Sequence, residues 1–336
     1  MNRKLLLLIV ALASLALPLG HLAAEAEGPA APPVGETLTG VLTVVSGDPM
    51  DMGAPGAASI ERFFLTTGSG ATVELQIDPA ARTFDLYRLN GQQVTVSAAA
   101  TAASATAGST PVVAVRAVAA ANPAAPAPST AVLGNTKWLT IACKFPDVAA
   151  EPEPLSYFQN MDAATYPGLD HYWREASYGA VDLGGSRAVG WYALPRPRSY
   201  YMVDANYVYL DRIFTDCAAQ ADPDVYFPDY YGIQFFLNDS MGCCDWTSWA
   251  NDKSLDGMVR RYATTFFGAR DYGGRSYDLS VIQHEMAHGY GLPHSYAGLY
   301  PGGDHNPYGN TWDVVSGNSH NCDSFTNPVY GCVGQP

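Results

Sequence analysis

The sequence predicts an α+β protein in which a C-terminal domain of mixed strands and helices, residues 135–336, follows a small all-β domain, residues 35–120. Two observations lead to this fold class. Before residue 120 the chain has short β-like runs separated by turn residues, whereas after residue 135 apolar runs alternate with segments of helical periodicity. With 336 residues, the chain is long enough to bury two separate cores.

Short runs of β-forming residues, separated by turn signals such as Ser46-Gly47-Asp48, predict the N-terminal domain. The runs are Leu38–Val45, Arg62–Thr66, Ala71–Ile77, Gln93–Ala98 and Val112–Val118. Strands of this length and spacing favour a small antiparallel barrel or sandwich. The stretch Ser97–Thr110 is almost entirely Ala, Ser and Thr and predicts a flexible loop, and the Ala/Pro-rich residues 121–134 predict a linker.

In the C-terminal domain, apolar runs predict strands and i, i+3, i+4, i+7 apolar spacing predicts helices. The expected strands are Trp138–Cys143, Ala180–Gly184 and Ile233–Leu237, and the expected helices are Tyr166–Tyr178, Asn206–Gln220 and Leu279–Gly289. Everything after the last helix is predicted to be loop-like. Strands and helices mixed in this way indicate an α+β domain.

The first residues of the chain indicate export. Arg3 and Lys4 precede an apolar run from Leu5 to Leu17 and then small residues, which is the pattern of a cleavable signal peptide over residues 1–26. A retained N-terminal anchor is the alternative. No later segment resembles a transmembrane helix, so we expect a secreted, extracellular protein without stable membrane association.

The six cysteines of the chain are compatible with disulfides in an exported protein. We expect Cys322 to pair with Cys332 because both lie in a short, loop-rich tail, and the adjacent Cys243 and Cys244 to pair with different partners. The sequence cannot choose among the remaining pairings. A cysteine metal cluster is disfavoured because the chain has no C-x-x-C pair.

With 32 acidic and 18 basic residues, the chain carries a formal net charge of −14. This charge disfavours nucleic acid and anionic membrane surfaces as partners. An acidic surface also keeps a secreted protein soluble, which is the simpler interpretation. We expect a monomer.

The most informative motif is H-E-x-x-H-x-x-G-x-x-H, formed by His284, Glu285, His288, Gly291 and His294. At this composition the five fixed positions coincide by chance with a probability on the order of 10⁻⁵. On a helix, residues four apart share a face, so two imidazoles can reach one ion, and the glutamate lies close enough to act on a water. The glycine allows a sharp exit that brings back the third histidine. Three neutral imidazoles leave the fourth tetrahedral position of zinc open, as in catalytic sites.

This extended motif resembles that of the metzincin clan of zinc endopeptidases, in which a methionine-containing turn follows the third histidine and forms an apolar floor beneath the metal. The segment Trp312–Ser316 is similar to that turn, with Val315 at the methionine position. No methionine follows Met286. Valine keeps the floor apolar but is shorter, so we expect reduced metal affinity or stability rather than an inactive site.

Within the clan, Tyr172–Gly179 and Gly190–Tyr192 are similar to the gametolysin group and its bacterial immune-inhibitor-A-like relatives. The resemblance extends from Lys137 to the C-terminus. It implies a zincin fold, with a mixed twisted sheet and an active-site helix.

The resemblance further implies that His284, His288 and His294 bind Zn²⁺ and that Glu285 is the general base. The residues themselves support the same roles, because a zinc-bound water has a pKa of about 7 and a nearby carboxylate can take its proton and pass it to the leaving amine. We therefore predict a secreted zinc metalloendopeptidase that hydrolyses protein or peptide substrates.

Two other functions stay open. The chain could be a zinc-binding protein that has lost turnover, or a zinc-dependent amidase acting on a cell-wall polymer. The role of the N-terminal domain is also open. In some metzincins a cysteine of a pro-segment blocks the zinc, but residues 1–142 of this chain contain no cysteine. An acidic side chain could serve instead. Alternatively, the domain could assist folding or bind substrate.

Several other polar residues are weaker candidates. Tyr308 or Tyr330 could stabilise an oxyanion, although a structural role is the simpler interpretation. His305 and His320 are interpreted as loop residues rather than ligands. Ca²⁺ is a further possible cofactor, although no EF-hand spacing is present. Its candidate ligands are Asp239, Asp245, Asp252 and Asp256.

Overall fold

The fold is known from a computed structural model, and its class is α+β, as predicted. The structure describes residues 37–49, 52, 57–78, 84–101, 110–122, 131–270, 275–295, 307–310, 312–316 and 326–334. The predicted signal peptide and residues 123–130 of the predicted linker lie outside this range. Within it, no helix is long and apolar enough to cross a membrane.

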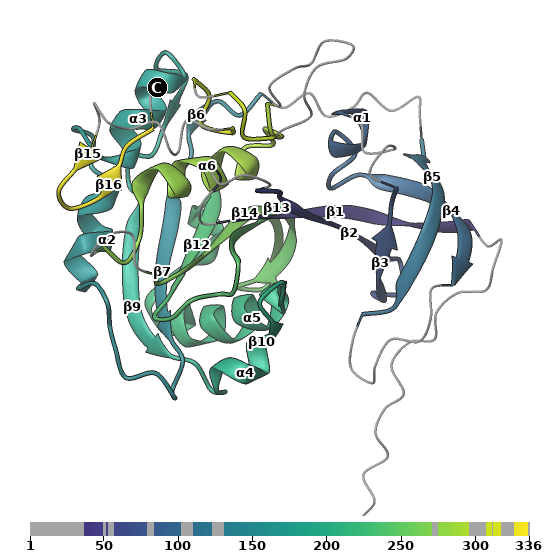
Figure 1. Cartoon of the computed structure of the whole chain (residues 1–336), viewed down its shortest axis with the longest axis horizontal. Helices are drawn as coiled ribbons and strands as arrows, with labels where there is room; N and C mark the ends of the chain where they lie inside the picture. Colours follow the sequence, from purple (N-terminus) through teal and green to yellow (C-terminus); the bar gives the residue numbers. More distant parts are fainter. Residues whose placement is uncertain are drawn as a thin grey trace, which may run out of the picture.

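The N-terminal part forms a five-stranded barrel (Figure 1). Its strands are β1 (Thr37–Pro49), β2 (Ile60–Thr67), β3 (Thr72–Gln76), β4 (Gln93–Thr101) and β5 (Val112–Ala120), with the short helix α1 (Phe84–Tyr87) before β4. The strand order β1-β2-β3-β5-β4 closes because β4 and β2 both pair with β1, and β3 and β5 run parallel. All five predicted runs are strands.

One expectation for this region is wrong. The predicted loop Ser97–Thr110 begins too early, because β4 continues to Thr101 and pairs there with Val113; small residues can pair as well as large ones, although residues 102–109 lie outside the described range. The barrel also shares its sheet with the C-terminal part. Through residues Val45–Pro49, β1 pairs with a strand of the C-terminal part, so one ten-stranded sheet runs through both.

The C-terminal part supplies the other half of that sheet and most of the helices. Its strands are β6 (Gly134–Asn135), β7 (Trp138–Lys144), β8 (Val181–Asp182), β9 (Arg187–Ala193), β10 (Met202–Asp204), β11 (Tyr207–Val208), β12 (Gly232–Leu237), β13 (Cys244–Leu255), β14 (Met258–Gly268), β15 (Thr326–Asn327) and β16 (Gly331–Cys332). Its helices are α2 (Leu155–Met161), α3 (Leu169–Ala176), α4 (Arg198–Tyr201), α5 (Leu210–Ala221) and α6 (Leu279–Gly289), with short 3₁₀ turns at Asp222–Asp224 and Phe227–Asp229.

The sheet order here is β13-β14-β12-β7-β9, in which β14, β12, β7 and β9 are parallel neighbours and β13 is antiparallel to β14. Every residue of β12 is buried, as expected of a parallel strand covered on both faces. Helix α5 packs in the apolar cluster on one face, and α2, α3 and α6 pack in the cluster on the other (Figure 1).

The sequence interpretation missed the long hairpin of β13 and β14. Its turn is Asp256-Gly257, where both residues have positive φ, as two-residue hairpin turns require. The alternating pattern of these strands is interrupted by a β-bulge between Ser248 and Asn251, which breaks the period of two that sequence reading depends on. The expectation that only loops follow α6 is also incomplete, since β15 and β16 form a small hairpin there.

The structure contains a disulfide between Cys143 and Cys217, which links β7 to α5. Cys243 and Cys244 bond to each other, so the prediction that they have different partners is wrong. Their Cα atoms are only 3.7 Å apart, below the usual range for disulfides, which is why the spacing suggested separate partners. Cys322, the predicted partner of Cys332, lies outside the described residues.

Candidate metal centre

Helix α6 carries the motif and has the predicted bounds, Leu279–Gly289. Asp278 caps its N-terminus by accepting a hydrogen bond from the Ser280 backbone N–H. All eleven residues are buried, because the helix lies between the sheet and the C-terminal segments. Beyond the helix, Gly291 has a φ of +87°, which permits the sharp exit that the sequence predicts.

The three motif histidines converge. The Nε2 atoms of His284 and His288 are 3.1 Å apart. The His294 ring lies 5.3 Å from the His284 ring and 4.6 Å from the His288 ring, measured between centroids. Two nitrogens bound to one tetrahedral zinc at 2.0–2.1 Å would be roughly 3.3 Å apart, so the helix presents its imidazoles at the spacing of a shared ion.

Backbone carbonyl groups orient two of these rings. The Nδ1 atom of His284 lies 2.6 Å from the Val314 carbonyl oxygen, and that of His288 lies 2.6 Å from the Leu292 carbonyl oxygen. A carbonyl can only accept, so Nδ1 carries the proton in both rings and Nε2 keeps the lone pair that a metal needs. Burial lowers the pKa of His288 to about 4, which keeps this imidazole neutral.

The turn that resembles the metzincin methionine turn lies directly beside the histidines. Val314 supplies the carbonyl that holds His284, and the Val315 carbonyl accepts a hydrogen bond from the backbone N–H of Ser295, next to His294. The Val315 side chain is buried in the same apolar cluster as Met286. The turn therefore contacts His284, and the residue that follows His294, through its backbone carbonyl groups.

Glu285 lies beside the histidines and is fully buried. The Thr247 hydroxyl, on β13, donates to its carboxylate and also lies 3.0 Å from its backbone oxygen. Burial raises the pKa of Glu285 well above its ordinary value, and the nearby charge of Asp48 raises it further. Thr247 thus orients the carboxyl group of Glu285, and no pattern in the sequence marks Thr247 for this contact.

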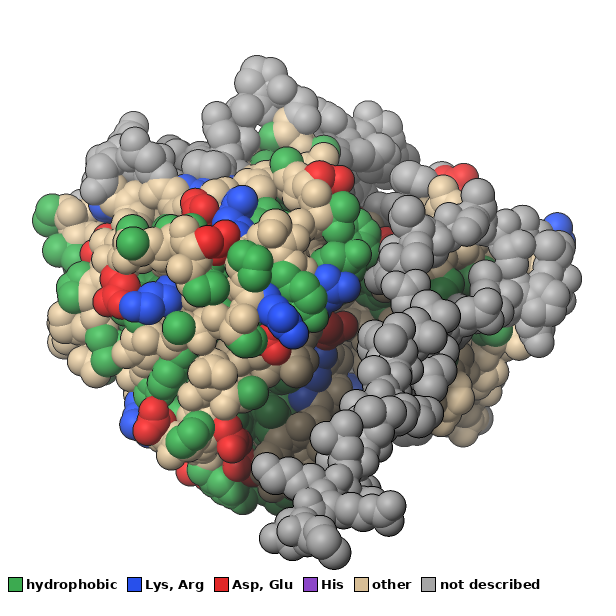
Figure 2. Space-filling view, turned by 90° about the horizontal axis from the view of Figure 1, so that it is seen from below, with side chains coloured by type: hydrophobic (Ala, Val, Ile, Leu, Met, Phe, Trp, Pro, Cys, Tyr) green, Lys and Arg blue, Asp and Glu red, His purple; other side chains and the backbone are tan. Residues whose placement is uncertain are grey.

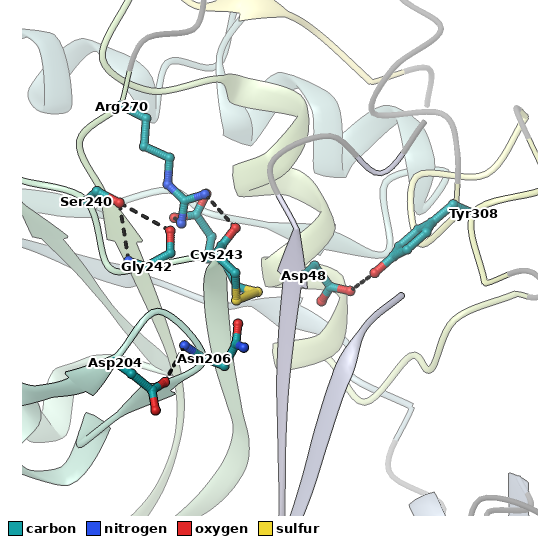
Figure 3. Close-up of a disulfide and its surroundings, with 10 residues drawn as sticks. Asp48, Asp204, Asn206, Ser240, Gly242, Cys243, Arg270 and Tyr308 are labelled. Atoms are coloured by element: carbon teal, nitrogen blue, oxygen red, sulfur yellow. Dashed lines mark hydrogen bonds and ion pairs between the residues drawn. A yellow bond between two sulfur atoms is a disulfide. The ribbon is translucent and has the colours of Figure 1, made fainter. Parts of the chain in front are cut away.

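The fourth group at the site is Asp48, near the end of β1 in the N-terminal part. Its Oδ1 atom is 2.9 Å from Nε2 of His294, and its Oδ2 atom is 3.6 Å from Nε2 of both His284 and His288. Tyr308 donates a hydrogen bond of 2.5 Å to Oδ1 (Figure 3). The sequence predicts a turn at Ser46–Asp48, but β1 continues through these residues to Pro49, and no local pattern marks Asp48 as a ligand.

The charges of Asp48 and His294 favour the ionised form of the Asp48 carboxylate. Burial alone would raise the pKa of Asp48, but the positive charge of His294 and the hydrogen bond from its Nε2–H hold this pKa well below its ordinary value. Burial acts in the opposite sense on His294, yet the Asp48 carboxylate raises the pKa of that imidazole. Burial and the Asp48 carboxylate also raise the pKa of Tyr308, so its hydroxyl stays protonated and remains a donor.

The donor set fits zinc. Three imidazole nitrogens and one carboxylate oxygen lie within 4.8 Å of one another, and they are the only such group of His, Cys, Asp and Glu among the described residues. Nitrogen and oxygen donors in this number are those of a tetrahedral zinc site. All four residues are buried, so an ion here would be shielded from solvent.

The structure does not bring the suggested calcium ligands together. Each of the four aspartates has a different partner: Asp239 pairs with Arg198, Asp245 with Arg270, Asp252 with Arg261, and Asp256 accepts from the Phe227 backbone N–H. Tyr330 packs away from the histidines and donates to the Tyr157 carbonyl oxygen, whereas Tyr308 is at the site. His305 and His320 lie outside the described residues.

Comparison of the chain with protein-family models, curated protein sequences and solved structures found no match. The functional argument therefore depends on the geometry of the site and on the sequence motif.

Proposed function

We propose that this chain is a secreted zinc-dependent metalloendopeptidase with a zincin-type C-terminal domain. The observation that supports it most is the convergence of the three motif histidines, with Nε2 of His284 and His288 3.1 Å apart and Glu285 buried beside them. A structural metal site has no need of a buried carboxyl group that lies beside the ligands but outside the ligand set.

The residues divide the chemistry among them. Zinc, when held by the imidazoles, supplies a Lewis acid that polarises a carbonyl oxygen and acidifies a water. Glu285 accepts the proton of the attacking water and delivers it to the leaving amine, and its raised pKa suits a group that must hold a proton between these two steps. Thr247 fixes the direction of that carboxylate from β13. Tyr308, which remains protonated, can donate to a developing negative charge.

The surface supports a protein or peptide substrate over a nucleic acid. On the face shown in Figure 2, acidic and basic side chains are interspersed and form no extended basic patch. The net charge of −14 points the same way. The two disulfides described above are compatible with an oxidising, extracellular environment.

One observation favours a second function, a zinc-binding protein without turnover. Asp48 fills the place around the histidines that a catalytic site keeps open, so a four-ligand site would be closed. The two functions differ in what happens when Asp48 is removed, because only the peptidase becomes active.

The test therefore compares three full-length proteins that all carry Asp48→Ala. The first has no other change, the second also carries Glu285→Gln, and the third carries the exposed control substitution Glu175→Gln on α3. Zinc content is measured by elemental analysis and hydrolysis is followed with casein. We expect about one zinc per chain in all three proteins, with cleavage lost only when Glu285 is replaced. Equal cleavage with and without Glu285 would refute its role, and zinc binding without any cleavage would support the non-catalytic alternative.

A further inference from the structure

We infer that three buried side chains of the sheet, Thr265, Gln234 and Thr140, are positioning residues for Glu285, which they reach through a hydrogen-bonded row that ends at Thr247. The inference rests on the proposed function and adds to it the residues that orient the general base.

The four side chains lie next to one another across four neighbouring strands, and we call them the polar row. Thr247 of β13 is opposite Thr265 of β14. Thr265 is opposite Gln234 of β12, and Gln234 is opposite Thr140 of β7. Residues opposite each other point to the same face of a sheet. Since the Thr247 hydroxyl contacts Glu285, the whole row points toward α6, which packs on this part of the sheet (Figure 1).

The polar row is an exception on an apolar face. All four of its side chains are fully buried. The positions two residues away on the same strands belong to the apolar cluster that contains the sheet-facing side of α6, namely Trp138, Ala142, Phe236, Ala263 and Phe267. A polar side chain in such surroundings is costly unless it is hydrogen-bonded. Four of them in one register therefore indicate that they bond to one another.

The hydrogen-bonding groups of the row are available for this. The hydroxyl oxygens of Thr140 and Thr265 and both amide atoms of Gln234 are buried with no partner among the described residues. Neighbouring strands lie about 4.7–4.9 Å apart, so a rotation of the side chain or one bridging water joins each group to the next. Thr66 and Thr72, which are opposite each other on β2 and β3, show the direct contact, with their hydroxyl oxygens 3.1 Å apart.

Donors and acceptors fit a single direction along the row. Thr247 donates to the Glu285 carboxylate, so its oxygen can accept from Thr265. The Thr265 oxygen can then accept from the Gln234 amide N–H. The Gln234 carbonyl oxygen accepts from Thr140. Each hydroxyl donates its one proton once, and each bond polarises the next.

The effect on Glu285 follows from the geometry of Thr247. Its hydroxyl oxygen lies 3.0 Å from the Glu285 backbone oxygen and also contacts carboxylate oxygen Oε2, but it has only one proton to donate. A donor from Thr265 fixes the rotation of this hydroxyl and directs its proton to the carboxylate. The other carboxylate oxygen, Oε1, has no hydrogen-bond partner in the described part of the chain and stays available for the reacting water.

The first part of the test is kinetic and uses the zinc-loaded full chain carrying Asp48→Ala, with a quenched fluorescent casein. Adding Thr265→Val replaces the hydroxyl by a methyl group of similar size. We expect kcat to fall roughly tenfold, with KM and zinc content unchanged, because the row acts on the base and not on the ligands. Thr265→Ser keeps the hydroxyl and should restore kcat.

Thr264→Val is the matched control. Thr264 is the next residue on β14, is equally buried, and points to the opposite face, where its hydroxyl lies 3.3 Å from the Ser248 carbonyl oxygen. Both valine substitutions remove a buried hydrogen bond and should lower the urea midpoint, but only Thr265→Val should lower kcat. An unchanged kcat in Thr265→Val, or an equal loss in Thr264→Val, would overturn the inference.

Gln234→Met tests the row one strand farther from Glu285. Methionine has nearly the shape of glutamine and no hydrogen-bonding group, so this variant remains informative if Thr265→Val does not fold. We expect a smaller loss of kcat than for Thr265→Val, again with KM unchanged. A kcat equal to that of the parent chain would remove Gln234 and Thr140 from the mechanism.

The second part needs no activity. A crystal structure of the zinc-free full chain should show Thr140, Gln234, Thr265 and Thr247 joined in order, either directly or through single waters. A break between Thr265 and Thr247 would overturn the inference.

The two proposals can fail separately. If no variant cleaves casein, the peptidase is refuted, and the crystal structure still decides whether the row exists. If the Asp48→Ala chain cleaves casein and Thr265→Val does not slow it, the peptidase is supported and the row is refuted.

Discussion

The two halves of strand β1 belong to different environments. From Thr37 to Val44 burial largely alternates along the strand, and Leu42 and Val44 point into the apolar core of the barrel. From Val44 to Asp48 every residue is buried, and the last three of them are Ser46, Gly47 and Asp48. The first half is a barrel strand whose apolar side chains pack into the barrel core. The second half consists largely of small and polar residues, which pack against β13 of the C-terminal part. The same strand can therefore be weakened in two distinct ways.

The largest effect on stability should come from the barrel half. Leu42→Ala removes a fully buried side chain, and we expect the free energy of unfolding to fall by about 2–5 kcal/mol. Leu38→Ala, at a partly buried position of the same strand, should cost clearly less. Urea unfolding followed by tryptophan fluorescence measures both. Equal losses would show that the barrel half is not packed as the burial pattern indicates.

A substitution in the second half should lower the free energy of unfolding through a steric clash rather than through a loss of buried apolar area. Gly47→Ala places a Cβ 2.5 Å from the Trp246 ring, so we expect a loss of about 1–3 kcal/mol in unfolding free energy. Gly68→Ala is the matched control, because a Cβ there meets nothing within 4 Å and no positive φ is required. It should be neutral or slightly stabilising. The comparison fails if both substitutions are tolerated alike.

The difference between the halves also explains what the sequence could predict. The α6 bounds, the convergence of His284, His288 and His294, and the place of Glu285 follow from helical spacing within eleven residues. The strand content of the barrel follows from local alternation as well. These features depend only on neighbours along the chain, which is why they could be predicted.

Asp48 could not be predicted in this way. Its contact with Tyr308 joins residues 260 positions apart, and its burial depends on the pairing of β1 with β13. That pairing depends on a hairpin that the β-bulge near Trp249 conceals in the sequence. The only sequence indication was negative, namely that residues 1–142 offer no cysteine to close the site.

A third prediction concerns a buried acidic side chain in the C-terminal part. Asp162 is half-buried as a residue, but its Oδ1 atom is fully buried without a hydrogen-bond partner among the described residues. Burial, and then the charge of Asp170, raises the pKa of Asp162 to about 7. The folded state thus binds a proton that the unfolded state releases near pH 4, so stability falls as pH rises from about 4 to about 7.

Asp162→Asn should remove that loss. We expect no difference from the wild type near pH 4 and a gain on the order of 1–2 kcal/mol above pH 7, discounted for partial exposure. Asp182→Asn is the opposite control, because a hydrogen bond from Asn135 lowers the pKa of Asp182 and its replacement should cost stability at neutral pH. Urea unfolding at several pH values measures both. A pH-independent difference for Asp162→Asn would contradict the burial argument.

The smallest expected effect tests the residue that touches both environments. The indole of Trp249 stacks on Tyr87 of the barrel and on His288, with centroid distances of 5.6 and 5.7 Å, and its N–H donates to Ser46. Trp249→Phe keeps an aromatic ring but loses the donor, so we expect a cost of about 1 kcal/mol in unfolding free energy and a zinc affinity within roughly tenfold of the wild type. Zinc titration against a chelating dye, alongside urea unfolding, measures both quantities. If Ser46→Ala restores stability in the Phe variant, the hydrogen bond is the cause; if it does not, the ring stack on His288 is what Trp249 contributes.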